Sequence, residues 1–309
     1  MNFTFNNHLT YTIGGREYGT RQTPYEKFIA NVGKIDLNYY AGSNWLQEQH
    51  RTADLVYNDL GKDAVVMFSG GTDSEIVLRA FIGIGITPRA VFIKFKHDYN
   101  IPEFYMAERI AAELNIKLDV FDLDIIDFYE SGAARDLASS YQCSQLAYLA
   151  AYHCILKYQA PAILGGEIFL QRYTSPTYAK WFYSLREEQD CSAMRLGLQT
   201  GIPIVNQWFS YTPEMIGYFI THPDIVSLVS NRFNYKLTSA SSKNAVLCNL
   251  MNTVIPKQKR TGFEKLRGFN HEAFNALRNC YLPKLEHSLD GIFMDELHSQ
   301  LFGNTYVGC

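Results

Sequence analysis

One short run of small polar residues and glycines is the stretch best suited to chemistry: it reads Ser69, Gly70, Gly71, Thr72, Asp73 and Ser74. Its two glycines lack a Cβ atom, so the backbone can turn sharply and approach a ligand closely. Successive backbone N–H groups in such a turn form a concave anion site when a helix begins beside them. The two serines add hydroxyl donors, and Asp73 could cap the helix or bind Mg²⁺. The pattern predicts a phosphate site, with a glycine-rich turn that binds nothing as the alternative.

The two commonest phosphate motifs do not fit this chain. A Walker loop needs GxxxxGK[ST], whereas Gly61-Lys62 precedes the expected strand and is followed by Asp63. The dinucleotide fingerprint needs three glycines that open a helix, whereas Gly83-Ile84-Gly85 follows one. A different class of phosphate loop is therefore expected.

Regular alternation of apolar strands and amphipathic helices surrounds the loop. The expected elements are strand Ala64–Phe68, helix Ser74–Ile82, strand Ala90–Phe95, helix Glu103–Leu114 and strand Lys117–Leu123. This order predicts the α/β class with a doubly wound, Rossmann-like parallel sheet. Ligands of such sheets bind at the carboxyl ends of the strands, where the loop stands.

A second glycine-rich turn follows farther along the chain. A long helix is expected over Ala138–Tyr158, and a short buried strand over Pro161–Leu164 runs into Gly165, Gly166 and Glu167. Its carboxyl end should lie beside the first loop. Glu167 is either a second Mg²⁺ ligand or an acid near a helix N-terminus.

Beyond residue 175 the alternation is expected to stop, and helical and aromatic segments to dominate. Thr212 and Pro213 suit the N-cap and first turn of a helix through Phe219. The one dense basic patch contains Lys259 and Arg260. It is either a solvated face or a loop ordered over a polyphosphate.

Composition sets the outer bounds. The 309 residues, 47% hydrophobic and 19% charged, suit one large α/β domain with additions or two modest domains. A net charge of −3 argues against nucleic-acid binding, and no apolar run reaches transmembrane length. Six scattered cysteines without a CxxC pair argue against a zinc ribbon or an iron–sulfur cluster and favour reduced thiols in the cytoplasm. The aromatic content of 14% indicates a large core or a stacking surface for bases or sugars.

The loop resembles the SGGxDS motif of the PP-loop ATP pyrophosphatases, which split ATP into AMP and pyrophosphate. Over residues 60 to 265 the chain is similar to the synthetase domain of asparagine synthetases and β-lactam synthetases, although its second loop is shortened to Gly165-Gly166-Glu167 and lacks the family's aspartate. Ile202–Tyr211 is similar to the segment that lines the acceptor site, which makes Trp208 and Tyr211 substrate candidates. Ile255–Phe263 is similar to a family motif whose lysine stabilises the reacting phosphate and carbonyl, and Arg260 takes the position of that lysine, with Lys259 adjacent.

The resemblance implies an adenine nucleotide alpha hydrolase-like fold and an AMP-forming ligase. Such an enzyme would use ATP and Mg²⁺ to adenylate a carboxylate or amide oxygen, and an amine would then displace AMP to form an amide bond. Asp73 with Glu167 would hold the metal, and the backbone of Phe92, Ile93 and Lys94 would read the adenine. No glutaminase domain is expected, so nitrogen would come from ammonia, an amine substrate or a partner protein. The resemblance divides the chain into an N-terminal hairpin extension (1–58), an ATP-binding α/β domain (59–205) and a helical C-terminal region (206–309).

Two other functions stay open. Sulfur transfer or base modification also uses PP-loop chemistry, and Cys143 or Cys309 could supply a reactive thiol, although a buried or incidental cysteine is the alternative for each. A nucleotide-binding module without turnover is the other, because the second loop lacks the usual acid.

Overall fold

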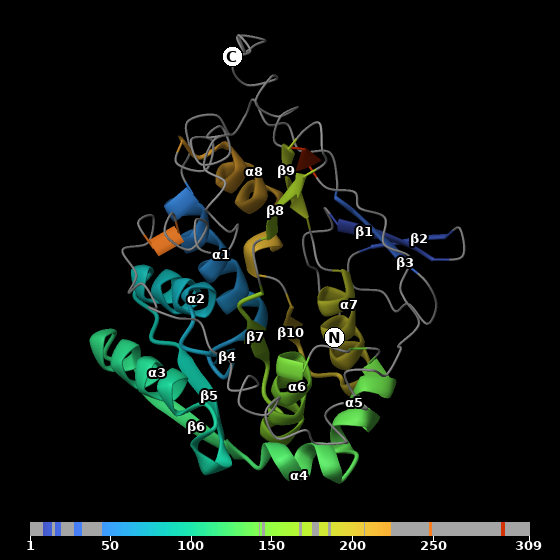
Figure 1. Ribbon diagram of the computed structural model, residues 1–309. Coiled ribbons are helices and arrows are strands. Elements are labelled where there is room, and N and C mark those ends of the chain that lie inside the picture. The colour runs from blue at the N-terminus through green and yellow to red at the C-terminus, as the bar shows by residue number, and fades with distance from the viewer. Residues whose placement is uncertain are drawn as a thin grey trace, which may run out of the picture.

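The computed structural model describes residues 9–13, 16–19, 28–32, 45–141, 143, 146–166, 169–174, 179–184, 187–206, 208–223, 247–248 and 292–293. At its centre lies a five-stranded parallel sheet (Figure 1). In spatial order its strands are β10 (Ile204–Val205), β7 (Ala162–Leu164), β4 (Val65–Met67), β5 (Arg89–Phe95) and β6 (Leu118–Leu123).

The strand order explains where a ligand would bind. β4 comes first in the chain and lies in the middle, β5 and β6 extend the sheet on one side, and β7 and β10 extend it on the other. This is the doubly wound order, and its direction of winding reverses between β4 and β7. The expected fold class is confirmed, and sheets of this class bind their ligands outside the carboxyl ends of the strands where the winding reverses, here β4 and β7.

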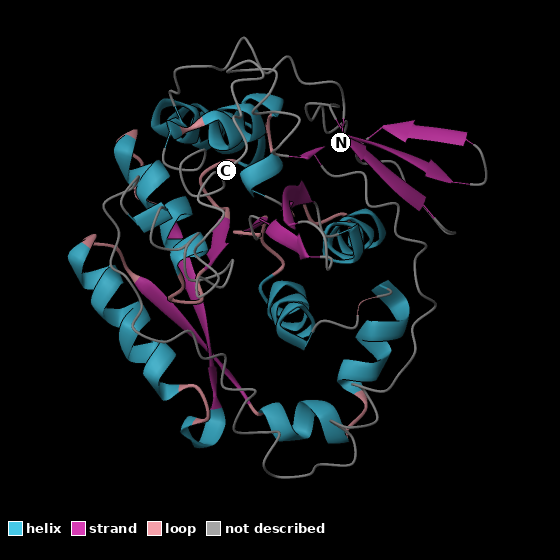
Figure 2. Ribbon diagram, turned by 45° about the horizontal axis from the view of Figure 1, so that its top comes forward, coloured by secondary structure: helices cyan, strands magenta, loops and turns pink. Residues whose placement is uncertain are grey.

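Helices cover both faces of the sheet (Figures 1 and 2). Alternate strand residues point to opposite faces, so Val66 and Phe68 join one core cluster while Val65 and Met67 join the other. The first cluster includes α1 (Trp45–Leu60), α2 (Thr72–Gly83), α3 (Ile101–Glu113) and α8 (Pro213–Thr221). The second includes α4 (Ile125–Glu130), α5 (Ala133–Tyr141), α6 (Leu146–Tyr158) and α7 (Glu187–Thr200).

The long helix expected over Ala138–Tyr158 is wrong in one respect, because α5 ends at Tyr141 and α6 begins at Leu146. The N–H of Cys143 donates to the carbonyl oxygen of Ala138, five residues back, at 3.1 Å, which closes the end of α5. Cys143 is fully buried between the two helices.

Short antiparallel sheets accompany the central one. β1 (Leu9–Ile13) and β2 (Arg16–Gly19) form the expected N-terminal hairpin, and β3 (Phe28–Val32) pairs with β1. Beyond residue 175 the described chain is less purely helical than expected, because it also contains strands. β8 (Phe169–Thr174), β9 (Ala179–Ser184) and β11 (Ile292–Phe293) form a second antiparallel sheet, and β10 returns to the parallel one.

Helix α1 crosses the boundary expected at residues 58 and 59. Its Ala53 and Val56 are fully buried in the core cluster that contains α2. A buried polar contact then joins it to α8: the hydroxyl of Thr212 donates to Glu48 Oε1 at 2.5 Å and accepts the N–H of Met215 at 3.0 Å. The expected N-cap at Thr212 and first turn at Pro213 are both confirmed. In the described ranges, no helix combines the length and the apolar character that crossing a bilayer requires.

Replacing Thr212 with Ala should lower the free energy of unfolding by about 1–2 kcal/mol, because the cap of α8 and the hydrogen bond to Glu48 are lost together. Urea unfolding followed by circular dichroism measures the change. Thr212→Ser keeps the hydroxyl and should stay within about 1 kcal/mol of the wild type. Equal losses in the two variants would assign the effect to the methyl group instead of the hydrogen bonds.

Candidate functional site

The loop between β4 and α2 is packed so tightly that glycine is required at its centre. Gly70 has a φ of +71°, in the left-handed region. A Cβ atom there would lie 3.0 Å from the carbonyl oxygen of Glu103 and 3.2 Å from the backbone nitrogen of Ala107, both on α3. Backbone conformation and backbone contact therefore both exclude a side chain at this position.

Hydroxyl groups inside the loop hold its shape. The hydroxyl of Ser74 donates to the carbonyl oxygen of Gly71 at 3.1 Å, and the oxygens of Ser69 and Ser74 lie 3.1 Å apart. The N–H of Gly71 donates to the Ser69 oxygen, and the N–H of Ser69 donates to the Ser74 oxygen, each at 3.3 Å. The two serines thus act first as internal braces of the loop.

The start of α2 supplies backbone donors. Gly71 is the N-cap residue and has no side chain with which to cap the helix. The first N–H groups of a helix find no partner in the helix itself, and the helix dipole adds partial positive charge there. The loop therefore presents an anion-binding helix terminus at the carboxyl end of β4.

The turn after β7 closes the other side of the loop. A Cβ atom at Gly165 would lie 3.3 Å from both the Cα and the nitrogen of Ser74, and Gly166 has a φ of +68°. The two glycine-rich turns, far apart in sequence, thus meet as expected from adjacent parallel strands. Glu167 lies outside the described residues.

The two acids of the first helical turn differ in role. Glu75 is fully buried, and its carboxylate accepts from Nε of Arg79 at 2.7 Å, while Arg79 also reaches Glu113 of α3 at 2.5 Å. Burial lowers the pKa of Arg79, but its hydrogen bonds to Glu113 and Glu75 outweigh this and raise it above its ordinary value. Glu75 therefore helps to join α2 to α3 through Arg79. Asp73 is half-buried, and it is the acid in the loop suited to Mg²⁺.

The described residues hold no cluster of three or more His, Cys, Asp or Glu side chains arranged for a metal ion. Mg²⁺ usually needs one or two protein carboxylates, with phosphate oxygens and water completing its octahedron. Asp73 together with a bound polyphosphate satisfies that requirement.

The residues expected to read adenine lie within β5. Phe92 is a core residue whose ring packs 5.5 Å from that of Phe104. Lys94 Nζ lies 4.9 Å above the same Phe104 ring and 3.8 Å from the carboxylate of Asp98. Ile93 contributes its backbone carbonyl oxygen, which accepts from Nδ2 of Asn100 at 2.8 Å.

Asn100 makes a contact beside the loop that the sequence did not predict. Its Oδ1 also accepts the N–H of Phe95 at 2.8 Å, so one buried amide satisfies two backbone groups of β5. Asn100 is the N-cap of α3, but its side chain makes no cap hydrogen bond. An asparagine before Ile101-Pro102 signals a helix start, and nothing in that pattern shows that its amide turns to the strand.

Trp208 and Tyr211 occupy core positions. The fully buried indole N–H of Trp208 donates to Gln49 of α1 at 2.6 Å, and its ring packs 5.6 Å from Phe81. The hydroxyl of Tyr211 donates to Asp59 at 2.6 Å. These contacts join the segment before α8 to α1 and α2, and the substrate role expected for the two rings stays a prediction. Lys259 and Arg260 lie outside the described residues.

The buried side chain of Thr72 marks another contact of the loop. Its hydroxyl oxygen lies 3.9 Å from Sγ of Cys248, which is also buried. A segment near the end of the described chain therefore touches the first residue of α2.

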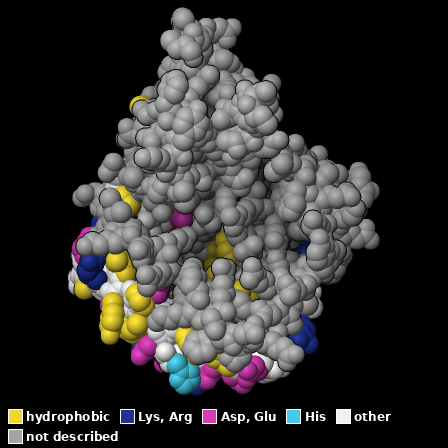
Figure 3. Space-filling model, viewed as in Figure 1, with side chains coloured by type: hydrophobic (Ala, Val, Ile, Leu, Met, Phe, Trp, Pro, Cys, Tyr) yellow, Lys and Arg dark blue, Asp and Glu magenta, His cyan; other side chains and the backbone are white. Residues whose placement is uncertain are grey.

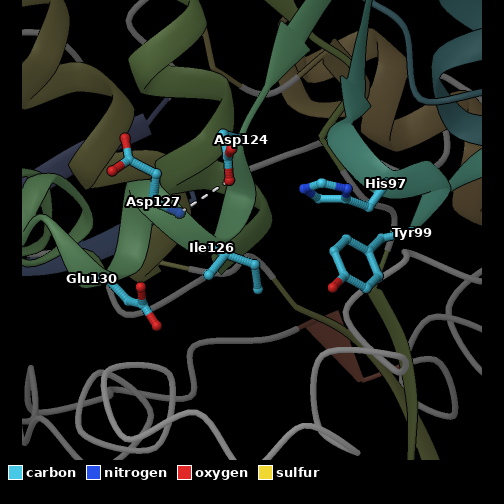
Figure 4. A pocket seen from close by; sticks show the side chains of 6 residues that line it. All are labelled: His97, Tyr99, Asp124, Ile126, Asp127 and Glu130. Atoms are coloured by element: carbon cyan, nitrogen blue, oxygen red, sulfur yellow. Dashed lines mark hydrogen bonds between the residues drawn. The ribbon is translucent and has the colours of Figure 1, made fainter.

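A separate pocket of about 470 Å³ lies where β5 and β6 end (Figure 4). Side chains from the segment after β5 face those of α4 and its N-cap; the lining residues are His97, Tyr99, Asp124, Ile126, Asp127 and Glu130. Acidic side chains and a histidine also gather at the lower edge of the space-filling view (Figure 3). Three carboxylates favour a cation over a phosphate chain, so this pocket does not compete with the glycine-rich loop for polyphosphate.

No protein-family model matches the sequence, and no curated protein matches it. Among solved structures, the chain is similar to NMN synthetase from Francisella tularensis, with a TM-score of 0.30 and 13% sequence identity. The match covers 77% of this chain and 96% of that one.

Proposed function

We propose that this protein is an ATP-dependent ligase of the PP-loop type. The carboxylate or amide oxygen of an acceptor attacks the α-phosphorus of ATP and releases pyrophosphate, and an amine or ammonia then bonds to the activated carbon and displaces AMP. One observation carries the proposal: the Ser69–Ser74 loop is enclosed by α3 at Gly70 and by the β7 turn at Gly165, at the switch point of the sheet. Glycine at both positions lets α3 and the β7 turn pack directly against the loop, which holds the backbone N–H groups of the loop in place.

The loop supplies the anion site in this proposal. Backbone N–H groups at the start of α2 would hold the pyrophosphate portion of ATP, and Ser69 and Ser74 keep the turn in shape through their mutual hydrogen bond. Asp73 would hold Mg²⁺. ATP supplies an electrophilic α-phosphorus and pyrophosphate as leaving group. The chain's task is positioning and charge stabilisation, which needs no nucleophilic side chain.

Two further parts of the proposal rest on the sequence. Lys259 or Arg260 would offset the charge that develops as pyrophosphate leaves, and Glu167 would assist Asp73 with the metal. Ammonia, an amine substrate or a partner protein would provide the nitrogen.

The decisive assay incubates the full chain with α-labelled ATP, Mg²⁺ and pools of small acids, amino acids and nucleosides. Substrate-dependent release of both AMP and pyrophosphate, with an amide product by mass spectrometry, supports the ligase. Tight ATP binding without pyrophosphate release in any mixture would replace it with a nucleotide-binding module.

Thiol burial argues against sulfur chemistry at two of the cysteines. Cys143 and Cys154 are fully buried, and burial raises the pKa of the Cys154 thiol to about 12. At pH 8 the reactive thiolate of Cys154 would then be on the order of one part in ten thousand.

Cys143 and Cys154 should therefore resist iodoacetamide at pH 8 in the native protein and react fully in urea. Peptide mapping by mass spectrometry measures the labelling of each. Fast labelling of Cys143 in the native protein, together with AMP release that depends on this cysteine, would favour sulfur transfer over amide formation as the function.

A further inference from the structure

The amide of Asn100 occupies a particular edge of β5. Backbone groups of successive strand residues alternate between the two neighbouring strands. The carbonyl oxygen of Val91 accepts from Phe68 at the end of β4, at 2.8 Å, so the backbone groups of Ile93 and Phe95 face the same side. The ladder with β4 ends at the pair Met67 and Val91. Asn100 thus fills the place where β4 would have continued.

The pattern of the two hydrogen bonds is fixed by chemistry. A backbone N–H can only donate and a carbonyl oxygen can only accept, so the Asn100 amide must present its oxygen to Phe95 and its NH₂ group to Ile93, each at 2.8 Å. An amino donor beside an acceptor is also what adenine presents with its N6 amino group and the neighbouring ring nitrogen. Hypoxanthine carries a carbonyl oxygen at that position, which cannot donate to Ile93.

This edge lies close to the phosphate loop. Asn100 is the N-cap of α3, and Glu103, one turn farther along, brings its carbonyl oxygen within 3.0 Å of the Cβ position at Gly70. Phe68, whose N–H completes the ladder to Val91, directly precedes Ser69. A nucleotide whose phosphates lie in the loop would therefore have its base within reach of this strand edge.

We infer that the Asn100 amide is an internal stand-in for adenine: it satisfies Ile93 and Phe95 when the nucleotide is absent and gives way to the base when ATP binds. The inference rests on the proposed function, because it places the base of the same ATP. It moves the recognition of adenine from Phe92–Lys94 to the carbonyl of Ile93 and the N–H of Phe95. The backbone groups of Ile93 and Phe95 then select adenine, since only a base that presents the same donor and acceptor as the Asn100 amide can replace it.

The test compares ATP and inosine triphosphate in the wild type and in Asn100→Ala. An Asn100 amide that occupies the strand edge about 90% of the time would weaken the apparent affinity for ATP about tenfold. Removing the amide removes this competition with the base. Calorimetry should show ATP binding about tenfold more tightly to Asn100→Ala, with inosine triphosphate unchanged within about twofold. Hydrogen exchange at the Phe95 N–H should be faster in the nucleotide-free variant and slow again with ATP, but not with inosine triphosphate.

Two further variants keep the test decisive. Asn100→Asp conserves the size of the side chain but cannot donate to Ile93. It should therefore shift the ratio of the affinities for ATP and inosine triphosphate in the same direction as Asn100→Ala. If Asn100→Ala does not fold, this ratio in Asn100→Asp decides the test. Asn58→Ala, on an exposed position of α1, should match the wild type. An unchanged ratio with ATP still bound would overturn the stand-in while leaving the proposed function intact. Absence of ATP binding to the wild type and to both Asn100 variants would overturn both.

Discussion

Replacing Asp73 with Asn should lower Mg²⁺-dependent release of pyrophosphate from ATP by about 100-fold or more, with little change in thermal stability. The substitution keeps the size of the side chain but removes the negative charge that the proposed metal requires. A 100-fold loss corresponds to about 2.7 kcal/mol of transition-state stabilisation, the scale typical of a preorganised electrostatic contact to a transferring phosphoryl group. The rate of pyrophosphate release at saturating ATP, with the melting temperature beside it, measures the effect.

Asp63→Asn is the matched control. Asp63 is an exposed acid just before β4, so its replacement changes the net charge by the same amount at a position outside the crevice. Its turnover should equal that of the wild type. Near-normal turnover in Asp73→Asn would contradict the metal role of this carboxylate, and equal losses in both variants would point to a general effect of charge.

Replacing Gly70 with Ala should destabilise the protein by about 2–6 kcal/mol and abolish nucleotide binding. Part of this cost, about 1–3 kcal/mol, comes from holding a residue other than glycine at a positive φ. A further 1–3 kcal/mol, roughly, comes from pushing the loop away from the backbone of Glu103 and Ala107. Chemical denaturation and ATP calorimetry at a temperature where the variant is folded measure the two effects.

Gly85→Ala separates the two costs. Gly85 has a φ of +78°, and in the described structure no atom lies within 4 Å of the Cβ position there. Gly85→Ala should lose only the stability that a positive φ costs a residue other than glycine, and it should bind ATP normally. The difference between the two variants then reports the contact between the loop and α3, and a Gly70→Ala protein that is no less stable than Gly85→Ala would refute that contact.

The parts of the fold that local chemistry decides could be predicted from the sequence. The strand before Ser69, the glycine-rich turn and the helix after it follow from apolar runs and glycine positions alone, and Thr212 with Pro213 marks a helix start by its own hydrogen-bonding and φ preferences. The place of Gly165 beside the loop follows from one general rule, that parallel strands end at the same edge of a sheet.

Other features depend on distant partners and could not be predicted from local sequence. Gln49 and Asp59, more than 150 positions earlier, accept the hydrogen bonds of Trp208 and Tyr211, and nothing in the sequence around the two rings signals these core contacts. The break between α5 and α6 has no glycine or proline to announce it. Asn100 carries the signal of a helix cap, and only the end of β4 beside it explains why its amide turns to β5.

The contact between Gly165 and Ser74 can form only after most of the sheet has been synthesised. The strands β4, β5 and β6 are neighbours in sequence and can pair early, but β7 must return from far along the chain to lie against β4. During synthesis the loop would thus remain open on one flank until Ala162–Leu164 has emerged. Because the contact between β4 and β7 joins segments far apart in sequence, we expect it to form late in folding: a chain truncated before β7 could form the loop's backbone but not the closed site.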